Sequence, residues 1–243
     1  MSVIAVIPAR MSSSRFPGKP MKLIHGIPMI GHCYYRVRMC NKVDETYVAT
    51  CDAEIYDYID SIGGKAVMTS DLHERASDRA AEAMLTIEDQ TGVRTSILVM
   101  VQGDEPMDTP TMVEQAISPM SSDASLQVVN LMGNIETVAE FEDPNTVKVV
   151  VGPDHKAIYF SREAIPSRKK GVTKVPMLKQ ICIIPFRRDY LLEFNRTPET
   201  PLEKIESVDM MRVIESGDRV KMVLTKEESY GVDTPEDLVR LEK

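Results

Sequence analysis

The sequence is short of positive charge. Its 29 Lys and Arg residues face 37 Asp and Glu residues, which gives a formal net charge of -8. Proteins that bind nucleic acid or anionic membranes usually present a basic surface, so we expect neither kind of partner. An acidic protein can still hold phosphate groups in a locally basic site, and a nucleotide ligand therefore stays open.

Cysteine and long apolar runs are also scarce. The four cysteines do not form a CxxC pair, which argues against a zinc site. Few, scattered cysteines in a chain of 243 residues are typical of a reducing compartment. The apolar run near the start is too short for a signal peptide, and nothing reaches transmembrane length. We therefore expect a cytoplasmic protein.

What is present is ordinary globular composition, with 43% hydrophobic and 27% charged residues. Strand patterns alternate with helix patterns along the first half of the chain, which indicates βαβ units and a mostly parallel α/β sheet. The expected strands are 3–7, 45–49, 65–68 and 96–101, and the expected helices are 28–40, 53–62, 76–88 and 110–120.

The pattern changes after residue 124. Strands are expected at 147–151, 157–160 and 180–184 without long helices between them, which indicates an antiparallel insertion that serves as a lid or a dimer surface. A helix at 207–215, a strand at 219–224 and a helix at 235–242 then return to the α/β pattern. The predicted division is a core of residues 1–124 and 205–243 and an insertion of residues 125–204.

The segment PARMSSSRFPGKP, residues 8–20, follows the first expected strand. In open α/β sheets, ligands bind at the carboxyl ends of the strands. Arg10, Arg15 and Lys19 are separated here by small residues, which allow backbone N–H groups to approach phosphate oxygens. The segment is not a Walker A loop, and a solvated basic loop is the alternative interpretation.

Two acidic motifs follow. Asp104 lies in VQGDEP at the end of the strand 96–101, and Asp233 lies in GVDTPEDL. Either residue alone could be a turn or a helix cap. Because Mg²⁺ on a nucleotide takes only one or two protein carboxylates, these two residues beside a basic loop predict a magnesium site.

These segments occur in order with GxPMIxH, DPNxVKVV and YFSRxxIP. Together they resemble the cytidylyltransferases that activate 3-deoxy-manno-octulosonate (Kdo), and the match covers nearly the whole chain. The resemblance implies a Rossmann-like, nucleotide-diphospho-sugar-transferase-like fold with a dimerisation insertion. It also implies a homodimeric enzyme that uses Mg²⁺ to transfer CMP from CTP to an acidic 2-keto-3-deoxy sugar, releases pyrophosphate and serves lipopolysaccharide or surface polysaccharide synthesis.

The resemblance also implies a role for particular residues. Arg15, Lys19 and Asp104 would be catalytic, and Asp104 and Asp233 would hold Mg²⁺. The nucleotide would contact the loop after the first strand and a second segment at 73–79; these residues are Pro8, Ala9, Arg10, Ser14, Arg15, Lys19, Arg75, Ser77 and Arg79. The sugar would contact Gln102, Arg162, Gln180 and Glu206.

Two segments depart from the family pattern. Arg75 and Ala76 replace Ser and Gly, so Arg75 is either a new contact to phosphate or carboxylate or a solvated side chain. Gln180 stands where the family has a His that contacts the sugar. If both face the ligand, positive charge has been relocated within the site, which favours a related acidic sugar at least as readily as Kdo itself.

Other functions remain open. The same chemistry could act on a nonulosonate or on a non-sugar phosphonate. A nucleotide-binding regulator without turnover is another class, but such a protein would not need both Asp104 and Asp233.

Overall fold

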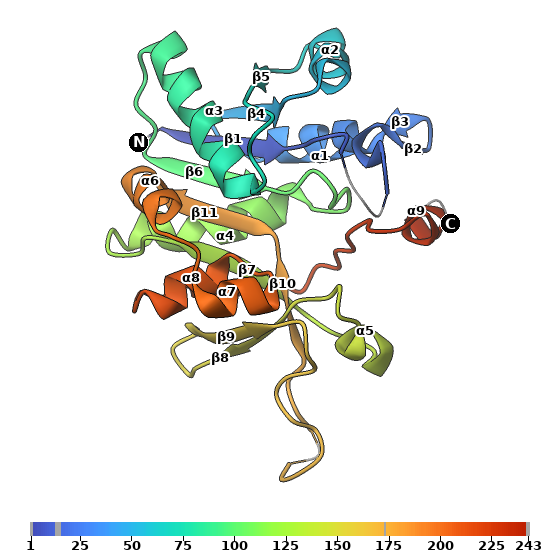
Figure 1. Ribbon diagram of the computed structural model, residues 1–243, viewed down its shortest axis with the longest axis vertical. Helices are drawn as coiled ribbons and strands as arrows, with labels where there is room; N and C mark the ends of the chain where they lie inside the picture. The colour runs from blue at the N-terminus through green and yellow to red at the C-terminus, as the bar shows by residue number, and fades with distance from the viewer. Residues whose placement is uncertain (1, 13–15, 173, 242–243) are drawn as a thin grey trace.

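The computed structural model describes residues 2–12, 16–172 and 174–241 and places two five-stranded sheets one beside the other (Figure 1). The first sheet has the order β11-β6-β1-β4-β5. All of its neighbours are parallel except β11, which pairs antiparallel with β6. The strands are β1 (Val3–Pro8), β4 (Glu45–Thr50), β5 (Ala66–Met68), β6 (Ile97–Val101) and β11 (Ile183–Arg187).

Helices cover both faces of this sheet, which is why β1 and β6 are apolar along almost their whole length. Alternate residues of β1 belong to different hydrophobic clusters: Ile4 and Val6 pack with helices on one face, and Ala5 and Ile7 with helices on the other. The first face carries α3 (Ala76–Thr91) and α6 (Arg188–Arg196); the second carries α1 (Met29–Arg38), α2 (Ala53–Ser61) and α4 (Pro110–Ser122).

The second sheet has the order β12-β7-β10-β8-β9, and only the β12–β7 pair is parallel. A long loop between β9 and β10 extends from this end of the molecule (Figure 1). The strands are β7 (Val129–Asn134), β8 (Lys148–Val151), β9 (Ala157–Ser161), β10 (Leu178–Ile181) and β12 (Lys221–Leu224). The remaining elements are η1 (Lys19–Met21), β2 (Leu23–Ile24), β3 (Ile27–Pro28), α5 (Val138–Glu142), α7 (Pro201–Glu206), α8 (Met210–Glu215) and α9 (Pro235–Leu241).

The sheets do not follow the boundaries predicted from the sequence. The expected strand 180–184 is two strands that meet at Cys182, with β10 in the second sheet and β11 in the first. The strand expected to return to the core, β12, instead pairs with β7 in the second sheet. Ile181 and Ile183 are both buried, so the apolar run continues while the chain passes between sheets. Periodicity therefore gave no sign of the break.

The predicted helix 207–215 begins later than expected, and a helix that was not predicted precedes it. Ser207 has a φ of 52°, a left-handed conformation that ends α7, and α8 begins only at Met210. Helix α3 runs to Thr91, further than predicted, and Gly92 ends it with a φ of 69°. The prediction of an α/β fold with a mostly parallel sheet and a second, largely antiparallel part is confirmed.

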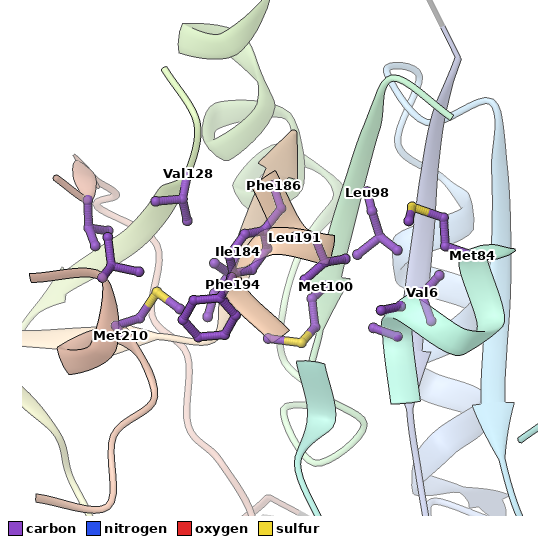
Figure 2. Packing of buried hydrophobic residues seen from close by; sticks show 14 of the residues in the cluster. Val6, Met84, Leu98, Met100, Val128, Ile184, Phe186, Leu191, Phe194 and Met210 are labelled. Carbon is purple, nitrogen blue, oxygen red and sulfur yellow. The ribbon is translucent and has the colours of Figure 1, made fainter. Parts of the chain in front are cut away.

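One hydrophobic cluster connects the two sheets. It contains Leu98 and Met100 of β6, Phe186 of β11, and Val149 and Phe160 of the second sheet. Figure 2 shows Phe186 and Phe194 near Leu191 and Met100, and the two rings lie 5.7 Å apart between centroids. The sheets therefore share a core. Within the described ranges, no helix is long and apolar enough to cross a membrane.

Leu98→Ala tests this core. Leu98 is fully buried, so truncation should lower the free energy of unfolding by about 2–5 kcal/mol. The matched control is Leu72→Ala, because Leu72 is 84% exposed and its truncation should change the free energy by less than about 0.5 kcal/mol. Denaturant unfolding measures both, and equal losses would contradict this packing.

Candidate active site

Three distant chain segments meet at the ammonium group of Lys19. Its Nζ lies 2.7 Å from Asp104 Oδ2, 2.7 Å from the carbonyl oxygen of Val232 and 3.7 Å from Asp233 Oδ1. The Lys19 side chain is only 11% exposed, so these contacts are shielded from water. The structure thus brings together the cation and both carboxylates that the sequence singled out.

The sheet explains how Lys19 and Asp104 meet. Strands β1 and β6 are parallel neighbours, so their carboxyl ends lie at one edge, and the segments after them are adjacent. Gly103 permits the closest approach, because a Cβ there would lie 3.0 Å from the carbonyl oxygen of Pro8 and 3.0 Å from the Ile30 side chain. Gly18 turns the loop with a φ of 70° directly before Lys19.

The pair of carboxylates fits a magnesium ion that is bound together with a nucleotide. In the described part of the chain, no group of three or more His, Cys, Asp or Glu residues could hold a metal ion by itself. Asp104 and Asp233 nevertheless share one cation, Lys19, and therefore lie close enough to face the same positive charge. Two carboxylates suffice for Mg²⁺ when phosphate oxygens and water complete the coordination.

A cavity of about 460 Å³, here called the smaller cavity, opens beside Lys19. It is predominantly basic, and its described lining also includes Pro8, Ala9, Gln102 and Gly103. Its lining carries four cationic residues, Arg10, Lys19, Arg75 and Arg79, and two acidic ones, Glu74 and Asp104. His73 also lines it. Several guanidinium groups around one space suit the oxygens of a polyphosphate.

The arginines of the smaller cavity differ in exposure and in their hydrogen bonds to the protein. Arg10 is exposed and donates from Nη1 to the carbonyl oxygen of His73 at 3.5 Å. Arg79 is buried and donates to Thr69 Oγ1 at 2.5 Å and to the same His73 oxygen at 3.5 Å. Arg10 is thus the more accessible of the two, while Arg79 fixes the wall.

Arg75 is neutralised by the protein. Its guanidinium contacts Glu199 at 2.5 Å and Glu203 Oε1 at 2.7 Å, and Glu203 also pairs with Arg212 at 2.6 Å. Arg75 lines the smaller cavity, but it carries no uncompensated charge. The expectation of a relocated positive charge therefore lacks support at this position.

Not every predicted nucleotide contact faces the cavity. Ser77 is fully buried, and its hydroxyl has no hydrogen-bond partner among the described residues. It is absent from the described lining of both cavities, because α3 turns it toward the protein interior. Ser14 and Arg15 lie outside the described residues.

A larger cavity of about 670 Å³ lies on the other side of Asp104, and Gln102 and Asp104 line both cavities. Its described lining is strongly acidic. The cationic residues are Arg162, Lys179 and Arg240, and the acidic ones are Asp104, Glu105, Glu136, Glu140, Asp143, Asp233 and Asp237. The two cavities thus have opposite charge and a common wall.

The predicted sugar contacts lie at or near the larger cavity, and they differ in how many of their hydrogen-bonding groups are already bonded to the protein. Gln180 lines it and donates from Nε2 to Asn130 Oδ1 at 2.6 Å. Arg162 lines it too, but donates to the carbonyl oxygens of Pro144, Glu206 and Ser207. The Glu206 carboxylate accepts from Tyr159, Ser161 and the Arg162 backbone and is absent from the described lining.

Sequence reasoning overlooked several residues of the larger cavity. Lys179 bonds to Glu140 at 2.6 Å and lies 4.9 Å from the ring centroid of Tyr230, which also lines the cavity. Asn130, behind Gln180, is fully buried. Its one sequence signal is a lone amide inside the apolar run 128–132, a polar residue that needs internal partners.

Two further carboxyl groups lie behind Asp104. Burial raises the pKa of Glu105 well above its usual range, and it also raises the pKa of Asp108, whose Oδ1 accepts from Ser229 at 2.8 Å. Burial disfavours the charged form of a carboxyl group. Negative charge at this edge of the sheet is therefore concentrated on Asp104 and Asp233.

The chain is similar in sequence to known cytidylyltransferases. A cytidylyltransferase family model matches residues 4–226. The chain belongs to the Kdo cytidylyltransferase family. The 3-deoxy-manno-octulosonate cytidylyltransferase of Geobacter metallireducens is 41% identical, with 98% of this chain and 95% of that protein covered. That of Thermodesulfovibrio yellowstonii is 40% identical, with 100% and 98% covered. The chain is therefore a nucleotidyltransferase enzyme, as predicted.

Solved structures give the same family. A structure of CMP:2-keto-3-deoxy-manno-octonic acid synthetase complexed with CTP aligns with a TM-score of 0.91 and 38% identity over 100% of this chain and 97% of the other. A cytidylyltransferase from Leptospira borgpetersenii aligns with a TM-score of 0.64 at 17% identity, which supports the fold alone.

Lys148→Met tests how the wall of the larger cavity is held. The buried Lys148 ammonium donates to the carbonyl oxygens of Asp143, Thr146 and Arg162, and two of these residues flank the cavity loop 143–146. Removing this donor should lower the free energy of unfolding by about 2–4 kcal/mol, because carbonyl groups lose their partner.

The matched control is Lys156→Met, since the partly exposed Lys156 ammonium pairs with Asp154 at the surface, and its loss should cost less than about 1 kcal/mol. Thermal or denaturant unfolding measures both variants. Equal stability of the two would show that Lys148 does not secure this wall.

Proposed function

We propose that the chain transfers CMP from CTP to Kdo and releases pyrophosphate. The observation that carries this proposal is the pair of cavities, one basic and one acidic, that meet at Gln102 and Asp104. Two substrates bound on either side of this wall would have their reacting groups beside Asp104. The family supplies the identity of the substrates, since the two relatives described above are named 3-deoxy-manno-octulosonate cytidylyltransferases.

CTP would occupy the smaller cavity. Arg10 and Lys19 would face its phosphates, because both line the cavity and the Arg10 guanidinium makes just one long hydrogen bond, of 3.5 Å, to the residues that the structure describes. Pro8 and Ala9 would approach the nucleotide along the backbone. Arg75 and Arg79 would shape the wall, since their guanidinium groups already contact protein oxygen atoms.

Asp104 and Asp233 would hold Mg²⁺. Bound Mg²⁺ would neutralise charge on the triphosphate oxygens. Lys19 now balances the two carboxylates, so its ammonium would be free to turn toward the phosphates once another cation faces Asp104 and Asp233. Lys19 would thus neutralise the two carboxylates in the empty site and the phosphates in the loaded site.

Kdo would occupy the larger cavity. A sugar acid presents many hydroxyl groups, and carboxylate and amide side chains are suitable acceptors for them. Gln180, Arg162 and Gln102 line this space. Because Arg75 is paired with Glu199 and Glu203, it offers no uncompensated charge to a sugar with a displaced anionic group, and we propose Kdo as the acceptor.

In the reaction, the anomeric hydroxyl oxygen of the sugar would form a bond to the α-phosphorus of CTP while the bond to the β-phosphate oxygen breaks. Pyrophosphate leaves with the electron pair of the broken bond, and the proton of the sugar hydroxyl passes to water. The protein mainly aligns the two substrates and balances charge, as expected for phosphoryl-group chemistry. Arg10 and Lys19, which line the smaller cavity, would face the charge that develops on the leaving pyrophosphate.

The remaining parts of the proposal concern the setting of the enzyme. We propose that it acts in the cytoplasm as a homodimer and that its product serves lipopolysaccharide or surface polysaccharide synthesis. The exposed apolar side chains of Ile158 on β9 and Val172 in the long loop, 58% and 76% exposed, support a partner surface in the region 125–204.

A panel of acceptors tests the substrate. With CTP and Mg²⁺, pyrophosphate release should be fastest with Kdo, and a nonulosonate or a phosphonate should give a kcat/KM at least about tenfold lower, because a site built for one hydrogen-bonding pattern rejects mismatched groups. A larger kcat/KM with a nonulosonate than with Kdo would identify that sugar as the acceptor instead. Absence of turnover with every acceptor would favour a regulator.

Asp104→Asn and Asp233→Asn test the metal site. Each change keeps the shape of the side chain and removes a charge, so Mg²⁺-dependent turnover should fall by roughly a thousandfold, while the melting temperature stays close to wild type. Asp154→Asn is the control, because Asp154 is exposed and belongs to neither described cavity lining. Near-normal turnover of Asp104→Asn would refute the assignment.

A further inference from the structure

Behind Gln180, in the wall of the larger cavity, lies a buried side chain whose hydrogen-bonding direction is fixed by the protein. Asn130 of β7 is fully buried, and its Nδ2 donates to the backbone oxygens of Leu131 at 2.9 Å and Ile181 at 2.7 Å. Both partners can only accept. The amide of Asn130 therefore has one orientation, with the NH₂ group toward the two carbonyls.

This orientation determines the next contact. With its NH₂ group occupied, Asn130 can offer only Oδ1 to Gln180, and Oδ1 can only accept. The Gln180 group that faces it at 2.6 Å must then be Nε2, the donor. A flipped Gln180 would set two acceptors against each other inside the protein.

The other end of the Gln180 amide faces a different environment. Gln180 lines the larger cavity, and its Oε1 has no hydrogen-bond donor among the residues that the structure describes. It is also absent from the buried polar atoms without a partner, so it is open to solvent. An exposed acceptor, held by a buried network, is thus available to a ligand.

We propose that Asn130 is a positioning residue that makes Gln180 an obligate hydrogen-bond acceptor for a hydroxyl group of the acceptor sugar. This proposal rests on the proposed function, since it assigns a role within the sugar site. It implies that recognition at this position is neutral: a hydroxyl donor is selected, and a carboxylate is not. Asn130 itself touches no substrate.

The first test is Gln180→Leu, assayed with CTP and Kdo. Loss of one neutral hydrogen bond should raise the KM for Kdo by roughly three- to tenfold. The KM for CTP should stay within about twofold, because Gln180 lines only the larger cavity. Gln127→Leu, the same change at an exposed position, should alter neither KM.

Kdo analogues that each lack one hydroxyl group identify the partner. One analogue should show nearly the same kcat/KM in wild type and in Gln180→Leu, because its missing hydroxyl is the one that Gln180 accepts. Uniform losses with every analogue, or no effect of Gln180→Leu at all, would overturn the proposal. This measurement does not depend on how well any Asn130 variant folds.

The positioning role is tested by a double-mutant cycle. If Asn130 acts through Gln180, Asn130→Ala should raise the KM for Kdo, but the double variant should be no worse than Gln180→Leu alone. A merely structural effect of Asn130 would instead add to that of Gln180→Leu. Asn134→Ala, an exposed change on the same strand, is the control.

The outcomes separate this inference from the proposed function. If the wild-type enzyme releases no pyrophosphate with CTP and Kdo, the proposed function is wrong. If the wild type turns over Kdo but Gln180→Leu leaves the KM for Kdo unchanged, or the effects of Asn130→Ala and Gln180→Leu add, only the role of Asn130 and Gln180 is wrong.

Discussion

The contact of Lys19 with Asp104 and Asp233 is the constraint on which the site depends. Two carboxylates close together repel each other, and the buried ammonium group makes their approach possible before any ligand arrives. The contact also joins the loop after β1, the end of β6 and the segment before α9. One charge cluster therefore sets the relative positions of three parts of the chain that are distant in sequence.

The sheet makes this cluster possible. Parallel β1 and β6 end at the same edge, and Gly103 lets the β6 end approach the Pro8 carbonyl without a side chain between them. The second sheet shares a hydrophobic core with the first, so the wall formed by β10 is fixed relative to Asp104. Rigid packing thus holds the two cavities against a common boundary.

Much of this arrangement was predictable, and the missing parts have a common reason. Local patterns gave the parallel strands, the basic loop and both carboxylates, because apolar periodicity and motif spacing are local properties. The partners of Arg75 were not predictable: Glu199 lies 124 residues away, and no local pattern links the two. The break at Cys182 was hidden for a similar reason, since Ile181 and Ile183 on either side of it are both apolar and buried, and only pairing in space separates the two strands.

The charges of the two cavities bear on what this enzyme class must do. Both proposed substrates are anions. If both cavities were basic, each cavity would attract either substrate. A basic cavity favours the triphosphate strongly, whereas the acidic lining of the larger cavity disfavours a polyphosphate and leaves hydrogen bonding to hydroxyl groups as the main source of sugar affinity. If the larger cavity binds the sugar as proposed, neutral, oriented groups such as Gln180 would matter more there than additional positive charge. On this view, charge separates the nucleotide from the sugar, and fixed hydrogen-bond direction selects among sugars.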